Sequence, residues 1–264
     1  MVAVKNTKNV VAANGLNGRS GSFNSAELMS AGLNLQAVFN LNELSDELVN
    51  QLKSVSEHYS KYSQLILLGH GGKKLWHEYN RPQLEQVDSQ EQYIIGDNPI
   101  DEYSCQVTSD YFDSYYPQLT TEYLYPKTNE TKEPIGLQAL GKLVGWHSDS
   151  LLKIGINPKW GTWFAYRVVL LADSSFTPTP YHKSKSPCLT CQTKICVQSC
   201  PAKALSTGNL ELETCCQYRK LSNSLCQDRC LARIQCPVAK EHQYNLEQIQ
   251  YHYGCSMRVI KQIS

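Results

Sequence analysis

The chain has 264 residues, of which 41% are apolar, and a formal net charge of +1 at pH 7. This length can bury a full hydrophobic core, either as one large domain or as one domain with a small appendage. The near-neutral charge gives no global signal for nucleic acid or for an anionic membrane. The longest apolar run, residues 163–171, is interrupted by Arg167 and is too short to span a bilayer. The first residues lack the apolar segment of a signal peptide, so we expect a soluble, cytoplasmic protein.

The chain opens with a segment, residues 1–25, that is rich in Asn, Gly and Ser and is predicted to be a flexible tail. A short helix over 26–31 follows, with Ser25 as its N-cap. Apolar alternation predicts a strand over 35–41, and a second helix begins at Ser45.

The next buried strand is predicted over residues 65–68, where the sequence is continuously apolar. It runs into Gly69-His70-Gly71-Gly72 and a helix over 73–79. A glycine turn before a helix suits an anion, although the lysine-hydroxyl pair of a P-loop is missing here and a plain tight turn is at least as good an interpretation. We expect His70 to be structural or solvated rather than a ligand.

An aromatic-rich helix is predicted over residues 101–116. Its tyrosines and phenylalanine could line a flat cofactor, but such a stripe is more often core and half-buried surface. A strand over 121–125 and an amphipathic helix over 136–144 come next.

Residues 145–173 are predicted to form a hairpin, with strands at 151–156 and 163–171 around an N-P-K-W-G turn. Arg167 lies in the second strand among apolar residues and needs a partner. That partner is either a cofactor or substrate group, or an internal acid. His147 is a candidate proton donor, with a surface turn histidine as the alternative.

Ten of the 11 cysteines lie at or after Cys188, so they belong to one module. Two sets each end on Cys-Pro, the pattern of a two-cluster bacterial ferredoxin. The eight candidate ligands are Cys188, Cys191, Cys196, Cys200, Cys215, Cys226, Cys230 and Cys236.

The cysteine spacing is longer than the ferredoxin run C-x2-C-x2-C-x3-C-P. The second gap of the first set has four residues, 192–195, and the gaps of the second set are stretched as well. Looser loops around intact clusters, or one degraded cluster, would both fit. Zinc and disulfides are the alternatives, although no second CxxC follows the first and nothing points to an oxidising compartment.

The span from about residue 136 to residue 237 resembles the C-terminal part of epoxyqueuosine reductases. The matching motifs are Gly145-Trp146, Ile156-Asn157-Pro158, Gly161-Thr162-Trp163-Phe164 and the cysteines. By the ferredoxin pattern, Cys188, Cys191, Cys196 and Cys236 would hold one [4Fe–4S] cluster. Cys200, Cys215, Cys226 and Cys230 would hold the other.

The motif D-N-P-I-D and residues 155–171 also look like the human-type cobalamin-processing protein that removes upper ligands from vitamin B12. Both relatives, and the reductive dehalogenases, bind a corrinoid on a nitroreductase-like α/β scaffold. The resemblance therefore implies a corrinoid-binding domain over 26–180 and a ferredoxin-like module with a helical tail over 181–264. The corrinoid would contact residues of the 145–167 segment, namely Trp146, Trp160, Gly161, Trp163 and Arg167.

The function implied is a corrinoid-dependent iron–sulfur reductase, an oxidoreductase that takes electrons from an external ferredoxin- or flavodoxin-like donor. Its substrate would be a tRNA or a small molecule, with no membrane partner. Epoxyqueuosine reductases use an aspartate just upstream of the proline matching Pro134 as the general acid. Here Thr131, Lys132 and Glu133 stand at that place, and Glu133 is the catalytic candidate that could substitute for the aspartate. The alternatives are a cobalamin-processing protein and an electron-transfer protein without a corrinoid.

Overall fold

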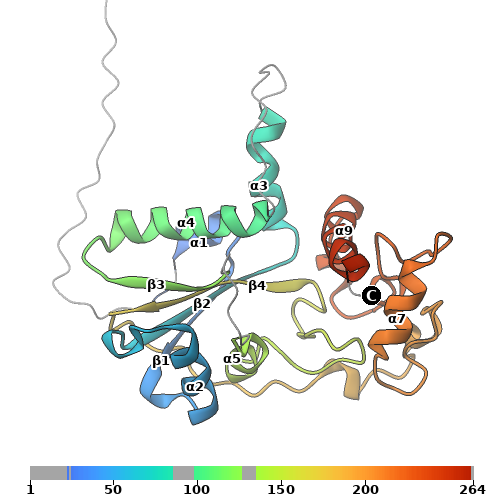
Figure 1. Cartoon of the computed structure of the whole chain (residues 1–264), viewed down its shortest axis with the longest axis horizontal. Helices are drawn as coiled ribbons and strands as arrows, with labels where there is room; N and C mark the ends of the chain where they lie inside the picture. Colours follow the sequence, from blue (N-terminus) through green and yellow to red (C-terminus); the bar gives the residue numbers. More distant parts are fainter. Residues whose placement is uncertain (1–22, 24, 86–97, 127–134, 263–264) are drawn as a thin grey trace, which may run out of the picture.

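The structure is a computed structural model that describes residues 23, 25–85, 98–126 and 135–262. It is a mixed α/β fold in which helices cover both faces of a small antiparallel sheet (Figure 1). The strands are β1 (Leu35–Asn40), β2 (Gln64–Gly71), β3 (Thr121–Tyr125) and β4 (Phe164–Ala172). The α-helices are α1 (Ala26–Ser30), α2 (Asp46–Val55), α3 (Lys74–Glu85), α4 (Pro99–Tyr115), α5 (Leu137–Leu143), α6 (Ile195–Gln198), α7 (Leu212–Lys220), α8 (Leu231–Ile234) and α9 (Leu246–Gln262). Short 3-10 helices lie at Leu41–Glu43, Tyr59–Lys61, Pro187–Leu189 and Lys240–His242.

The sheet has the strand order β1-β2-β4-β3, and every neighbouring pair is antiparallel. Every residue of β2 is buried, as expected of a central strand with both faces covered. Successive side chains of a strand point to opposite faces of the sheet. Alternate residues of β2 and β4 therefore belong to two different cores.

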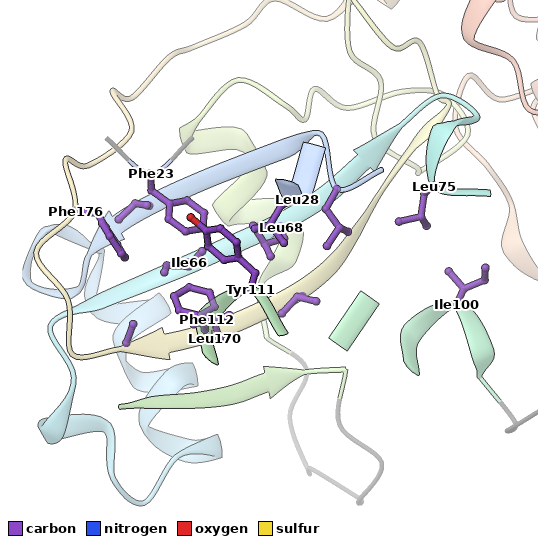
Figure 2. Close-up of a cluster of buried hydrophobic side chains, with 14 of the residues drawn as sticks. Phe23, Leu28, Ile66, Leu68, Leu75, Ile100, Tyr111, Phe112, Leu170 and Phe176 are labelled. Carbon is purple, nitrogen blue, oxygen red and sulfur yellow. The ribbon is translucent and has the colours of Figure 1, made fainter. Parts of the chain in front are cut away.

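One core lies between the sheet and the layer of α1 and α4, which cover the same face (Figure 1). Ile66, Leu68 and Leu170 of the sheet pack there against Tyr111 and Phe112 of α4 (Figure 2). Tyr111 and Phe112 are buried in this core, Tyr103 packs against it and Tyr115 is exposed, which agrees with the predicted stripe of core and half-buried surface. The opposite face carries Leu65, Leu67 and Val169 against α2 and α5.

The last residues of the predicted tail belong to this core. Phe23 is buried and lies 5.2 Å from Phe176 between ring centroids (Figure 2). The Ser25 hydroxyl accepts a hydrogen bond from the Leu28 amide, as predicted for the N-cap of α1. The other residues of the predicted tail lie outside the described part of the chain.

The hairpin predicted within residues 145–173 is wrong in its first strand, 151–156. Residues 151–156 form turns, joined to the rest by a single bridge between Ser148 and Ile156. The Ser150 hydroxyl donates to the Ile154 carbonyl and Lys153 takes a φ of 54°, so the chain closes on itself. Leu152 packs against the cysteine segment instead of entering a strand. The predicted strand over 163–171 is confirmed as β4, and that over 121–125 as β3.

The cysteine-bearing segment lies beside one end of the sheet, and α9 folds back between it and the sheet domain (Figure 1). Tyr244 contacts Trp163 at 5.2 Å between ring centroids, and Tyr251 contacts Trp76 at the same distance. The last helix contributes His252, and the segment before it Tyr244, to the lining of a cavity described below. In the described part of the chain, no helix is both long and apolar enough to cross a bilayer.

Candidate active-site cavity and cysteine centres

The first group of four thiols is Cys188, Cys191, Cys196 and Cys236. Burial raises the pKa of Cys196, and the neighbouring charges of the other three thiols raise it further. Burial likewise raises the pKa of Cys236, with contributions from Cys188 and Cys191. Cys196 and Cys236 are 40 residues apart in the sequence, so only the fold brings these thiols together.

The second group is Cys200, Cys215, Cys226 and Cys230, and all four line one cavity of about 320 Å³. Burial raises the pKa of the Cys215 thiol to about 11, followed by the charge of Cys230 and a smaller effect of Cys200. Cys215 comes from α7, and Cys230 caps α8 by accepting from the Arg233 amide. These two groups are the same ones that the ferredoxin pattern predicts.

All eleven cysteines lie in the described part of the chain, and none is bridged to another. Within those residues no group of three or more His, Cys, Asp or Glu side chains is placed to hold a metal ion. Iron ligation itself stays a prediction.

A second cavity, of about 360 Å³, lies between the sheet end of β4 and the C-terminal segment. Tyr166 and Arg167 of β4 reach into it, together with His147, Tyr244 and His252. We call it the central cavity. It is lined by aromatic rings together with several polar and charged side chains, a combination found in ligand sites.

Arg167 reaches this cavity through a break in the β4 pairing. Leu68 pairs with Val168 but Gly69 pairs with Tyr166, so the register skips Arg167. A bulge of this kind re-aims a side chain. The Arg167 guanidinium donates to the Asp101 carboxylate at 3.1 Å and to His70 Nδ1 at 3.1 Å. The internal acid left open by the sequence is therefore Asp101, while the guanidinium still lines the cavity.

His70 is a fully buried residue that holds Arg167 in place. Its Nδ1 accepts from the Arg167 Nε–H, so Nε2 carries the proton and donates to the Tyr244 hydroxyl oxygen at 2.9 Å. Burial, and then the charge of Arg167, lowers the pKa of His70 well below its usual value. His70 is therefore a structural residue, as expected: it is buried and hydrogen-bonded on both ring nitrogens.

His147 and Tyr166 form the polar pair of the central cavity. His147 Nδ1 lies 3.2 Å from the Tyr166 hydroxyl oxygen, and His147 Nε2 lies 3.8 Å from the exposed carboxylate of Asp149. His147 also lines a neighbouring open cavity of about 890 Å³ that contains Asp149. The pair therefore connects the central cavity to a solvent-accessible carboxylate. Tyr166 was not predicted as a site residue, because nothing in the sequence distinguishes it from its neighbours in β4.

The other predicted cofactor contacts lie outside the lining of the central cavity. Trp163 is fully buried between Tyr244 and the Arg233 guanidinium, which sits 4.4 Å from its ring centroid. Trp160 packs on the backbone of Gly71, and Trp146 lies at the edge of the core under α5. Gly161 has a φ of +59° and no room for a Cβ beside the Val238 carbonyl. The catalytic candidate Glu133 lies outside the described residues.

The central cavity and the cavity of the second thiol group share a wall. Ile154, Arg233 and His252 line both of them. Burial, and then the charges of Arg167 and Arg233, lowers the pKa of His252 to about 3. A group bound by the second set of thiols would thus be separated from the central cavity by one layer of side chains.

Comparisons with known proteins give only distant likenesses. No protein-family model matches the chain, and no curated protein sequence matches it significantly. Among solved structures, the chain is similar to an epoxyqueuosine reductase with a tRNA-Tyr epoxyqueuosine-modified stem loop, at 12% identity and a TM-score of 0.47, covering 84% of this chain and 66% of that one. It is also similar to the Streptococcus thermophilus epoxyqueuosine reductase, at 10% identity and a TM-score of 0.49, covering 81% and 64%.

The catabolic reductive dehalogenase NpRdhA is similar at 11% identity and a TM-score of 0.48, covering 87% of this chain and 33% of its own. The chain thus spans less than two thirds of the length of each of these structures. Both classes of reductase are those that the sequence motifs resemble. At such low identity, a function has to be argued from the residues of this chain.

Proposed function

We propose that the protein is a corrinoid-dependent iron–sulfur reductase. The observation that carries the proposal is the shared wall of Ile154, Arg233 and His252 between a four-thiol cavity and the central cavity. Electron transfer needs a donor group close to an acceptor site. The shared wall means that a cluster in the four-thiol cavity would lie close to a group bound in the central cavity. The first group of thiols is suited to receive electrons from an external carrier in the reducing cytoplasm, because its member Cys188 lines the open cavity.

Two kinds of cofactor fit these residues. Four cysteines around each centre would hold a [4Fe–4S] cluster by thiolate ligation. The central and the open cavity meet at His147, and together they offer room for a large flat macrocycle. When bound, the clusters supply single electrons and a corrinoid supplies the reducing chemistry at its metal.

The side chains of the central cavity then have three tasks. Tyr166 holds a proton inside the cavity, and its neighbour His147 can replace that proton from the side of Asp149. Arg167, fixed by Asp101 and His70, presents a positive charge to an anionic group of the substrate or cofactor. The aromatic rings of Phe164, Tyr166 and Tyr244 exclude water from the reacting atoms.

The decisive experiment is a measurement of iron, sulfide and zinc per chain after anaerobic purification, followed by titration with cobalamin. We expect about eight irons per chain, together with a change in the cobalamin spectrum on binding. Zinc in place of iron would overturn the proposal. Eight irons without cobalamin binding would leave an electron-transfer protein, and removal of upper ligands without turnover of an epoxide or halide would indicate cobalamin processing.

A further inference from the structure

Arg219 on α7 is a buried cation at the wall of the second thiol cavity. Its side chain is 6% exposed and lines the same cavity as the four thiols of that group. Its guanidinium donates to the carbonyls of Cys226 at 2.9 Å, Tyr253 at 3.1 Å and Gln227 at 3.3 Å, and to the Ser256 hydroxyl at 2.8 Å. All of these acceptors are neutral.

No carboxylate of the described residues lies within ion-pair distance of Arg219. Arg233, which lines the same cavity, likewise has no acid among the described residues and donates to the Thr162 carbonyl, but two other arginines of this region have acids. Arg167 pairs with Asp101, and Arg229, which lines the same cavity, pairs with Asp228 at 2.7 Å. A buried guanidinium without an anion is costly, because carbonyl dipoles replace only part of its hydration. The place next to Arg219 where negative charge can gather is the cavity of the four thiols.

We propose that Arg219 is the buried counter-charge of the iron–sulfur cluster held by Cys200, Cys215, Cys226 and Cys230. The inference rests on the iron–sulfur part of the proposed function and does not require a corrinoid. Four thiolates around a cube carry net negative charge, and reduction adds one more. A fixed positive charge at short range in a dry environment stabilises the reduced form most. Arg219 therefore raises the reduction potential of this cluster relative to one without such a charge.

The first thiol group has different cations nearby. It is flanked by Lys194, whose amine is exposed and donates to the Cys188 carbonyl. An exposed charge is screened by water and acts weakly on a nearby group. Arg219 lines the second thiol cavity and not the first group, so its charge is expected to act on the potential of the second cluster.

The test is a redox titration, followed by electron paramagnetic resonance, of the anaerobic full-length protein and three variants. Arg219→Gln removes the charge but keeps hydrogen-bond donors, and Arg219→Lys keeps the charge. Arg229→Gln is the matched control, because it removes a charge from the same cavity wall where the side chain is 32% exposed and paired. We expect Arg219→Gln to shift one of two midpoint potentials to a more negative value and to leave the other unchanged. Arg219→Lys should recover most of that shift, and Arg229→Gln should change the potentials much less.

Loss of half the iron in Arg219→Gln but not in Arg219→Lys would also support the proposal, because the lysine keeps the positive charge and the glutamine does not. Loss of iron in both variants would assign Arg219 a structural role and overturn it. Unchanged potentials in Arg219→Gln, or a shift no larger than that of Arg229→Gln, would overturn it too. A wild-type protein that holds both clusters but binds no cobalamin would refute the reductase and leave the role of Arg219 standing.

Discussion

His147 and Tyr166 stack in the central cavity with an interplanar angle of 15°, and His147 Nδ1 lies 3.2 Å from the Tyr166 hydroxyl oxygen. Burial lowers the pKa of His147 and raises that of Tyr166, so both side chains are neutral near pH 7. A neutral imidazole beside a neutral phenol can accept or return one proton without leaving a charge in the cavity.

Replacement of Tyr166 by Phe removes this hydroxyl and keeps the ring. We expect reductive turnover to fall by roughly 10²- to 10⁴-fold, the usual contribution of a general acid, while cobalamin affinity stays within about twofold. Steady-state kinetics and a cobalamin titration measure the two effects. Tyr123→Phe, in β3 and outside the central cavity, is the control and should keep its activity. Full activity of Tyr166→Phe would remove the pair from the mechanism.

Cys215 and Cys216 are neighbours on α7, but only Cys215 lines the second thiol cavity. Cys215→Ala should reduce the iron content from about eight to about four per chain, because one cube loses a corner ligand. Cys216→Ala should keep about eight irons per chain. Iron and sulfide analysis of anaerobic protein decides the matter. Equal iron in the two variants would contradict the ligand set derived for α7.

The pH dependence of stability should carry a signature of His252. Its pKa is lowered to about 3 in the folded state, against an ordinary value near 6.5, mainly by burial. Such a histidine is neutral in both states at pH 7, so the folded protein is fully stable there. Below pH 6.5 the unfolded chain takes up the proton and the folded one does not. Stability is therefore lost as the pH falls from about 6.5 toward 3.

Between pH 7 and pH 5, His252 should contribute up to about 2 kcal/mol to the loss of unfolding free energy. Urea unfolding of the wild type and of His252→Gln at the two pH values measures this term, because the variant should lose less stability on acidification. His58→Gln alters an exposed histidine and should behave like the wild type. A variant with the same acid sensitivity as the wild type would show that His252 is not the titrating group.

Leu68 is fully buried in β2, under the α4 layer (Figure 2). Leu68→Ala should lower the free energy of unfolding by roughly 2–5 kcal/mol, because it leaves a cavity in a packed core. Leu225→Ala makes the same chemical change at a side chain that is 62% exposed, and it should cost less than about 0.5 kcal/mol. Denaturant unfolding of the two variants gives the comparison. A small effect at Leu68 would mean that this face of the sheet is loosely packed.

The sequence by itself determined most of the local elements and the gathering of the cysteines into one module. Apolar alternation located β1, a continuous apolar run located β2, and the N-P-K-W-G turn preceded β4. Cap and aromatic patterns located α1 and α4, and the Cys-Pro endings marked two sets of thiols. These signals are local, because hydrogen-bond periodicity and metal-ligand spacing act over a few residues.

Only the tertiary structure decided which residues face the central cavity. Tyr166 and Arg167 reach it because a bulge breaks the pairing of β4 with β2, and their partners His70 and Tyr244 come from segments far apart in the chain. Of the tryptophans predicted as cofactor contacts, Trp163 packs with Tyr244 and Ile249, Trp160 packs on Gly71, and Trp146 packs against the core that contains α5. A long-range contact depends on how whole elements pack, and no short stretch of sequence carries that information.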